Sequence, residues 1–317
     1  MWPLKVLSSY KISISIIDNH FVDLDEKHWL RNSQWNETKE NIILVHGYAS
    51  GDDVLPMIVL RDAYLHHGEY NVFVIDWSAL SPAPCYVAAV HNMRTVAHCV
   101  SKTFTELRSQ GLNAEKITCV GHSLGSHICG LMANYINFRM ERIIALDPAR
   151  PLIRPGNQNR LDTGDARSVQ VMHTNAGYYG EGGRVGHIDF CVNGGRRQPY
   201  CANTTNVNLC SHIWAICYMA QSLFENNEII AEPCLRKCPS GVNLNPTSRP
   251  QHRRRIGKSY RYGYALNYGV VMGQHTPKTA TGSYCVKDTS VPFCPKHEND
   301  IGDKRCCLTS PEWAELI

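Results

Sequence analysis

One serine between two glycines is the first feature of this chain that could do chemistry. Gly121, Ser123 and Gly125 stand two residues apart, after a short apolar run typical of a strand and before a helical pattern. Such a strand-to-helix turn exposes the serine hydroxyl and leaves no room for a Cβ on either side. The N-terminal N–H groups of the helix would also point at an anion formed there. The motif therefore predicts a nucleophile at Ser123.

A serine nucleophile needs a histidine to accept its proton and an acid to orient that histidine. Asp147 ends the first strand pattern after Ser123, 24 residues on, so both side chains would lie at one edge of adjacent strands. Asp76 also ends a strand, but it precedes the serine and is interpreted as a structural acid. Among the later histidines, spacing favours His173, at a strand end, and His212, in a loop before a helix. Spacing does not separate these two.

The oxyanion of an acyl-transfer intermediate needs two backbone donors. The residue after the nucleophile supplies one, which is Leu124 N–H. The second is expected from a loop after an earlier strand, where Gly47 would let the backbone approach and Tyr48 N–H would donate. His122, inside the serine motif, is interpreted as a packing residue.

Strand and helix patterns alternate around these residues. The strand patterns cover 41–45, 71–77, 117–122, 142–149 and 168–173, and the helical patterns cover 54–67, 86–110, a stretch from Ser123 to about Asn137, and 211–224. This alternation predicts a doubly wound, mostly parallel α/β sheet with sites at the carboxyl ends of its strands. Residues 175–210 are interpreted as a loop that handles substrate, and 260–285 as β structure that closes the sheet.

The composition favours a secreted globular protein. The 317 residues carry a formal net charge of +4, which is too weak to argue for a nucleic-acid partner. Fourteen cysteines without a CxxC pair or metal-ligand spacing indicate disulfides. Sequons at Asn36 and Asn203 are candidate glycosylation sites. Residues 1–20 do not read as a signal peptide, so we expect the true start to be missing or replaced, and no stretch is long enough to span a bilayer.

Six ordered motifs together resemble the animal pancreatic-lipase family, above all the insect neutral lipases and the phospholipase A1 enzymes that include vespid venom allergens. The resemblance covers roughly residues 35–295, and its motifs are His46-Gly47-Tyr48, Gly121-His122-Ser123-Leu124-Gly125, Ala145-Leu146-Asp147-Pro148-Ala149, Gly186-His187-Ile188-Asp189-Phe190, Asn193-Gly194-Gly195 and Cys210-Ser211-His212.

The resemblance implies an α/β-hydrolase fold and assigns roles to residues. It implies a catalytic triad of Ser123, Asp147 and His212, with the N–H groups of Tyr48 and Leu124 as the oxyanion hole. The choice of His212 over the other candidate histidine thus comes from the resemblance and not from spacing.

The family's lipases carry a long lid between two disulfide-bonded cysteines before the catalytic histidine. The matching pair here, Cys201 and Cys210, encloses only eight residues, and the loop at 176–185 is also short. In the family these two features accompany phospholipase A1 activity, and a small polar lid leaves room for a large head group. The expected function is hydrolysis of the sn-1 acyl ester of glycerophospholipids at a membrane or micelle surface. A glycan at Asn203 would sit on this lid.

Two further departures concern partners and metals. We expect no counterpart of the family's C-terminal β-sandwich domain, since the chain ends soon after residue 295, and a colipase partner is therefore not expected. The family's calcium loop is only partly matched, since Arg160, Asp162 and Asp165 are present but Asn157 stands where a glutamate is expected. One fewer carboxylate would weaken calcium binding. No metal and no cofactor are therefore expected.

The resemblance divides the chain into three parts. Residues 1–40 are predicted to be an N-terminal strand and loop segment of the same domain, 41–295 the lipase domain, and 296–317 a tail. Two other functions stay open, a triacylglycerol or galactolipid lipase of the same fold and a non-catalytic lipid-binding protein of the yolk type. Proteins of the second kind lose a member of the triad, whereas all three positions are intact here.

Overall fold

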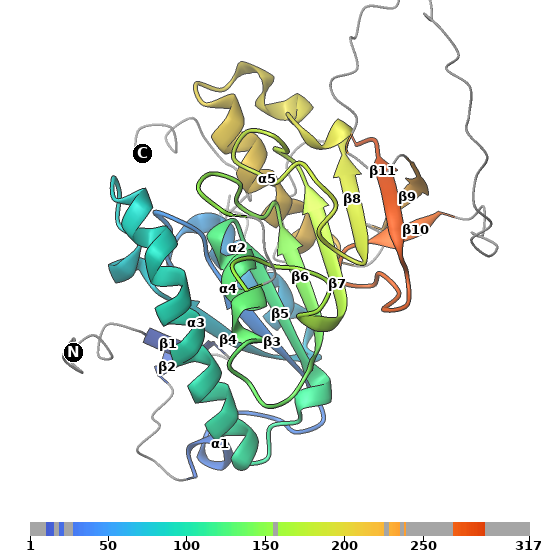
Figure 1. Cartoon of the computed structure of the whole chain (residues 1–317). Coiled ribbons are helices and arrows are strands. Elements are labelled where there is room, and N and C mark those ends of the chain that lie inside the picture. The colour runs from blue at the N-terminus through green and yellow to red at the C-terminus, as the bar shows by residue number, and fades with distance from the viewer. Residues whose placement is uncertain are drawn as a thin grey trace, which may run out of the picture.

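One large sheet organises the protein. The computed structural model describes residues 11–15, 19–21, 28–154, 158–224, 228–234, 238 and 269–288. The strands of the sheet (Figure 1) are β1 (Lys11–Ser15), β2 (Asn19–Phe21), β3 (Glu40–Val45), β4 (Tyr70–Asp76), β5 (Ile117–His122), β6 (Met140–Leu146), β7 (Ala166–His173), β8 (Ile188–Val192), β9 (Ile229–Pro233), β10 (Val270–Met272) and β11 (Gly282–Val286).

The strand order is β10-β9-β11-β8-β7-β6-β5-β3-β4-β1-β2. From β11 to β4 all neighbours are parallel, and the outer pairs at both edges are antiparallel. The predicted fold class, a doubly wound and mostly parallel α/β-hydrolase sheet, is confirmed. Because the central strands are parallel, β3, β5, β6 and β7 all end at one edge of the sheet, and the loops that follow them meet there.

Helices cover both faces of this sheet. They are α1 (Trp29–Asn32), α2 (Leu55–His67), α3 (Tyr86–Ser109), α4 (Leu124–Met132) and α5 (Val207–Gln221), with short 3₁₀ turns at η2 (Ser78–Leu80), η3 (Ala114–Lys116), η4 (Asn193–Gly195) and η5 (Pro199–Asn203). In Figure 1, α3 and α4 lie in front of the sheet and α2 and α5 behind it. Each helix buries its apolar side against the strands.

Successive residues of a strand point to opposite faces, so the sheet separates two apolar layers. Ile43 and Ile143 belong to the core beneath α3 and α4. Their neighbours Leu44 and Ile144 belong to the core beneath α2 and α5. Burial on both faces explains why these strands are apolar throughout rather than alternating.

The structure differs from the sequence analysis in several places. Helix α5 begins at Val207, four residues before the expected start, so His212 lies inside this helix and not in a loop before it. Residues 175–210, expected to be a loop, contain the buried strand β8, which pairs in parallel with β7 and β11. Strand β9 was also not predicted. Helix α4 ends at Met132, five residues before the expected end, because the following residues form a turn that leads into β6.

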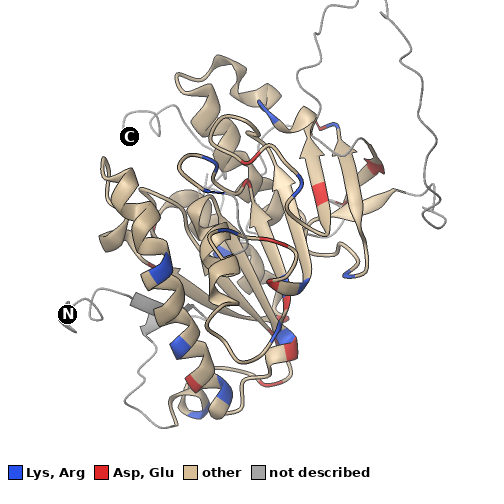
Figure 2. Cartoon of the chain, in the orientation of Figure 1, with Lys and Arg blue, Asp and Glu red and all other residues tan. Residues whose placement is uncertain are grey.

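Other elements match closely. Strand β1 pairs with β4 in the sheet. Strand β10 lies within the stretch 260–285 that was expected to close the sheet, and β11 ends one residue beyond it. Residues 260–268 and the predicted tail, 296–317, lie outside the described residues. Among the described helices, none combines the length and apolar character that a membrane crossing requires. Basic residues are scattered among acidic ones along the described chain (Figure 2).

Candidate active site

Ser123 occupies a tight turn between β5 and α4. Its backbone has φ 56° and ψ −121°, a left-handed conformation that side chains rarely adopt. The flanking glycines are sterically required, because a Cβ on Gly121 would overlap the backbone at Gly125, and one on Gly125 would overlap the carbonyl of Val45. A Cβ on Gly47 would lie 2.7 Å from the Ser123 Cβ. The two glycine-containing segments therefore pack directly against each other.

Asp147 follows β6 and is fully buried. Its Oδ2 lies 2.5 Å from Nδ1 of His212, and its Oδ1 accepts hydrogen bonds from the N–H groups of Thr174 and Asn175 at 2.9 and 3.0 Å. Gly180 packs against the carboxylate so closely that a Cβ there would overlap it. The carboxylate is thus held by backbone donors on one oxygen and aligned with the His212 ring on the other.

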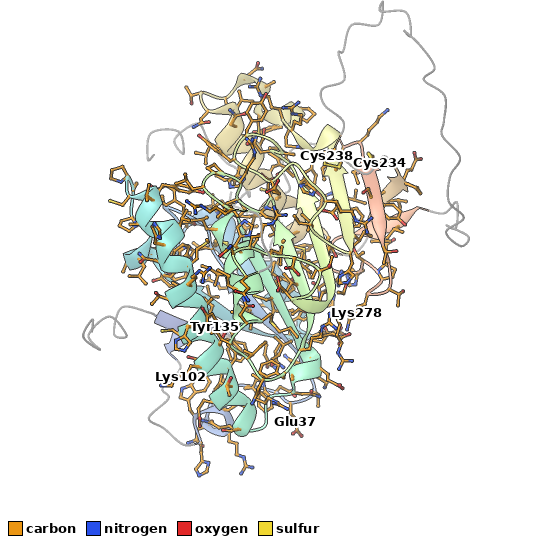
Figure 3. All side chains as sticks on the ribbon, in the orientation of Figure 1. Glu37, Lys102, Tyr135, Cys234, Cys238 and Lys278 are labelled. Atoms are coloured by element: carbon orange, nitrogen blue, oxygen red, sulfur yellow. A yellow bond between two sulfur atoms is a disulfide. The ribbon has the colours of Figure 1, made fainter. Side chains whose placement is uncertain are left out.

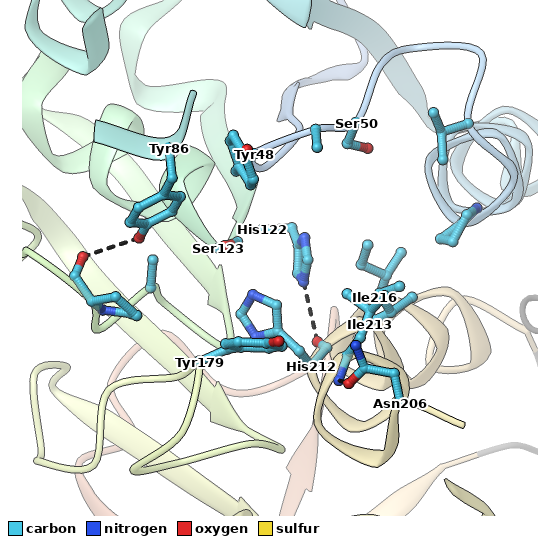
Figure 4. A pocket seen from close by; sticks show the side chains of 16 residues that line it. Tyr48, Ser50, Tyr86, His122, Ser123, Tyr179, Asn206, His212, Ile213 and Ile216 are labelled. Atoms are coloured by element: carbon cyan, nitrogen blue, oxygen red, sulfur yellow. Dashed lines mark hydrogen bonds between the residues drawn. The ribbon is translucent and has the colours of Figure 1, made fainter. Parts of the chain in front are cut away.

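Ser123 and His212 both line one cavity of about 530 Å³ (Figure 4). Each is only 6% exposed. The remaining lining is mainly apolar and aromatic and comes from Tyr48, Ala49, Ser50, Val54, Pro56, Tyr86, His122, Ala149, Pro151, Tyr179, Asn206, Leu209, Ile213 and Ile216. A cavity with this lining suits a hydrocarbon chain beside a few polar groups.

His122 contacts His212 through both a hydrogen bond and its ring. Its Nε2 donates to the backbone carbonyl of His212 at 3.1 Å (Figure 4), and the two rings lie 4.6 Å apart. Burial, followed by the proximity of His212, lowers the pKa of His122 well below 6.5. A neutral ring with its proton on Nε2 fits this contact. The interpretation of His122 as a packing residue therefore missed its contact with His212.

His173, the other candidate histidine, has a different partner. Its Nε2 lies 2.9 Å from Oδ1 of Asp189, and its Nδ1 lies 2.9 Å from the carbonyl of Glu181. Burial opposes protonation, but the hydrogen bond and the charge of Asp189 raise the pKa of His173 above 6.5. The structure therefore pairs Asp147 with His212, and His173 with Asp189.

Asp76 supports the loop that carries Gly47 and Tyr48. It accepts a hydrogen bond from Ser78 N–H at 3.0 Å and lies 3.3 Å from Nε2 of His46. Burial would raise the pKa of Asp76, but these contacts lower it to about 2. The neighbouring Trp77 donates its ring N–H to the His46 carbonyl at 2.9 Å. This network agrees with the interpretation of Asp76 as a structural acid.

The lid is short and tied to the cavity. Cys201 and Cys210 form a disulfide with an S–S distance of 2.03 Å. Within this loop the side chain of Asn206 caps α5 by accepting from Leu209 N–H at 3.0 Å, and both residues line the cavity. Asn203 lies exposed on the same loop. Asn36, the other sequon, is also exposed, and glycosylation at both stays a prediction.

Three further disulfides join described cysteines, Cys119–Cys129, Cys191–Cys238 and Cys234–Cys285. The first links β5 to α4 directly behind the serine turn. Figure 3 marks Cys234 and Cys238 near β8 and β11, where the other two bridges tie the chain to these two strands. The prediction of a disulfide-bonded protein is confirmed.

In the described part of the partly matched calcium loop, the carboxylates accept hydrogen bonds from N–H groups of the loop itself, and the absence of a metal stays a prediction. Asp165 Oδ2 accepts from Asp162 N–H at 2.8 Å, and Asp162 Oδ1 accepts from Gly164 N–H at 2.6 Å. Burial, with the nearby Asp162 charge, raises the pKa of Asp165 to about 7. Asn157 lies outside the described residues. Within the described part of the chain, no three acids, cysteines or histidines are grouped as metal ligands would be.

The family model and the relatives that match this chain all carry the names of lipases or of a phospholipase. The family model described as Lipase matches residues 17–238. Phospholipase A1 member A from Bos taurus is 31% identical over 90% of this chain and 64% of its own length. Lipase member H-A from Xenopus laevis is 32% identical over 67% of this chain and 47% of its own length. Lipase member H from Danio rerio is 34% identical over 64% of this chain and 46% of its own length. The chain thus spans between about half and two thirds of these curated relatives.

Proposed function

The chain belongs to the lipase family, whose model matches well over half of its length, and from this premise we propose that it is a secreted serine esterase that hydrolyses the sn-1 acyl ester of glycerophospholipids. The observation that carries the proposal is the 2.5 Å contact between Asp147 and His212, placed on the same cavity as Ser123. A hydroxyl, an imidazole and a buried carboxylate in this order are the parts that acyl transfer requires.

In the first half of the reaction, His212 Nε2 takes the Ser123 proton while Oγ attacks the ester carbonyl. Asp147 keeps the proton of the ring on Nδ1 and stabilises the imidazolium. The N–H groups of Leu124 and Tyr48 are proposed to bind the oxyanion, since the Gly47 segment packs against the serine turn. His212 then protonates the departing lysophospholipid oxygen, which leaves an acyl-serine.

In the second half, water replaces the leaving alcohol. His212 removes a proton from water as it attacks the acyl-serine carbonyl, and returns that proton to Ser123 Oγ when the fatty acid departs. The apolar lining of the cavity offers the acyl chain a place during both halves, with Ile213 and Ile216 from α5 on one side.

Two observations favour a phospholipid over a triacylglycerol. The lid between Cys201 and Cys210 is short and starts with a buried, disulfide-bonded cysteine, so it has little surface with which to enclose a second and third acyl chain. One relative that matches over most of this chain carries the name phospholipase A1. Both observations support a substrate in which a polar head group replaces one of the three acyl chains of a triacylglycerol.

The proposal is tested by giving the purified, oxidised protein phosphatidylcholine with different labels at sn-1 and sn-2, beside a triolein emulsion. Release of the sn-1 chain with little triolein cleavage is the expected result. Ser123→Ala is the matched control, and it should abolish release while binding to lipid remains.

Cleavage of triolein in strong preference to phosphatidylcholine would refute the argument from the lid but leave the triad in place. Cleavage of neither lipid, together with no labelling of Ser123 by a fluorophosphonate probe, would refute the esterase itself. A lipid-binding role would then take its place.

A further inference from the structure

Three arginines surround one turn beside the cavity. Arg150 donates from Nη1 to the carbonyl of Gly177 at 2.9 Å. The guanidinium carbons of Arg196 and Arg197 lie 5.3 and 4.8 Å from the ring centre of Tyr178. Three cationic groups from two distant segments of the chain are therefore held around residues 177 and 178.

This turn is connected to the His212–Asp147 pair. Asn175 N–H donates to Asp147, and the side chain of Asn175 donates to the Arg196 carbonyl at 2.8 Å. Tyr179 lines the cavity, and its ring centre lies 5.7 Å from that of His212. The backbone N–H of Arg150 donates to the Tyr179 carbonyl at 2.8 Å. The positions of the arginines are therefore coupled to the catalytic groups through short contacts.

The positive charge at this turn has no paired carboxylate in the part of the chain that the structure describes. None of the three arginines forms an ion pair with an acid of the described residues. Glu181, a nearby carboxylate, is paired with Arg160 at 3.3 Å. Like charges repel one another, so a bound anion would stabilise this arrangement. Guanidinium groups favour phosphate because their N–H pairs match its oxygens.

The space next to Arg150 suits a polar group attached to a lipid. Arg150 lines a second hollow of about 520 Å³ together with the ion pair Arg160–Glu181, and Pro151 lines both this hollow and the catalytic cavity. The two spaces are therefore neighbours on either side of the segment 149–151. Arg196 and Arg197 do not line this hollow and contribute their charge from the neighbouring turn. In a glycerophospholipid the sn-1 ester and the phosphate are attached to the same glycerol, so a group that binds the phosphate would lie close to the ester site.

We propose that Arg150, assisted by Arg196 and Arg197, binds the phosphate of the glycerophospholipid substrate while the sn-1 chain occupies the catalytic cavity. The inference rests on the proposed function and adds the residues that select a phosphate-bearing substrate. A diacylglycerol with the same acyl chains has no group for these arginines.

The test compares phosphatidylcholine and diacylglycerol of identical acyl chains in micelles of one uncharged detergent. Arg150→Ala should lower kcat/KM for phosphatidylcholine about tenfold, as expected for a lost charged hydrogen bond, and change that for diacylglycerol less than about twofold. Arg150→Lys should fall in between, because it keeps the charge but loses the paired N–H groups. The double variant Arg196→Ala/Arg197→Ala should show a smaller loss on phosphatidylcholine alone.

Arg108→Ala is the matched control, since Arg108 is an exposed arginine that also lies over an aromatic ring, 5.2 Å from the centre of Phe138 at the far end of α3. It should change neither activity. Equal losses on both lipids for Arg150→Ala, or no loss on either, would overturn the proposal.

A binding measurement separates this inference from the proposed function. On a Ser123→Ala background, dihexanoylphosphatidylcholine should bind about tenfold more weakly when Arg150 is also replaced by alanine, whether or not the wild-type protein cleaves phospholipids. A wild-type protein that fails to cleave phosphatidylcholine would refute the proposed function alone. Equal affinity of both variants for the lipid, or a site that takes only inorganic phosphate, would refute the arginine site.

Discussion

Three histidine–aspartate pairs lie near the carboxyl edge of the sheet in the described residues, and in two of them both side chains are almost completely buried. Of these two pairs, only His212–Asp147 borders the cavity. His212 and Asp147 lie 2.5 Å apart, and His173 and Asp189 lie 2.9 Å apart. In both pairs the carboxylate is almost completely buried, and the histidine side chain is at most 7% exposed. Burial, distance and residue type therefore do not distinguish a catalytic pair from a structural one.

The surroundings of the second ring nitrogen make the difference. Both nitrogens of His173 are engaged, one by Asp189 and one by the Glu181 carbonyl. The Asp189 carboxylate also accepts from the N–H groups of Val185 and Gly186 at 3.1 and 3.2 Å. This pair fastens the loop before β8. His212 instead uses one nitrogen for Asp147 and borders the cavity that Ser123 also lines, as a general base must.

The largest expected effect comes from exchanging one carboxylate in each pair for an amide. Asp147→Asn should lower kcat by about 10⁴-fold with the fold retained, because the amide favours the wrong tautomer of His212. Asp189→Asn should leave kcat per folded molecule within a few-fold of the wild-type value. Ester hydrolysis normalised by circular dichroism measures both, and near-normal activity in Asp147→Asn would remove that residue from the mechanism.

A second, smaller effect concerns stability. Asp189→Asn should lower the free energy of unfolding by about 3–5 kcal/mol, because it leaves His173 buried without its charged partner. Urea unfolding under oxidising conditions gives the value. The double variant with His173→Gln should recover part of the loss, and strictly additive losses would mean that the two side chains are not coupled.

The smallest expected effect is the pH dependence of the stability that the His173–Asp189 pair contributes. The pKa of His173 is raised in the folded protein, so the folded state holds its proton more tightly than the unfolded chain does. The stabilisation is fully present below about pH 6.5 and is lost as the pH rises through the raised pKa. The unfolding free-energy difference between wild type and His173→Gln, measured by urea unfolding, should therefore be smaller at pH 8.5 than at pH 5.5.

The contribution of His122 to stability should depend on pH in the opposite direction to that of His173. Its pKa is lowered in the folded protein, so its contribution to stability is present above pH 6.5 and is lost as the pH falls. His122→Gln, measured at the same two pH values, should therefore lose more stability at pH 8.5 than at pH 5.5. The same trend in both variants would show that the pH dependence comes from other groups.

Local patterns predicted much of the fold. The five strand patterns and three of the four helical patterns correspond to observed elements within a few residues, since buried parallel strands are continuously apolar and long helices are periodic. Strand β8 was missed because its five residues lie in a stretch rich in glycine and asparagine. It is a strand because β7 and β11 on either side supply hydrogen bonds, which no local pattern reveals.

The sequence by itself determined that Ser123 stands in a strained turn, because the neighbouring glycines and the apolar run before them are local features. It also placed Asp147 at the end of a strand. The resemblance named His212 as the partner of Asp147, but only the tertiary structure shows this contact and which arginines gather near the cavity. Asp147 and His212 are 65 residues apart in the sequence, and Arg150 and Gly177 are 27 residues apart. Such contacts depend on how strands and loops pack in three dimensions, and spacing along the chain carries no information about them.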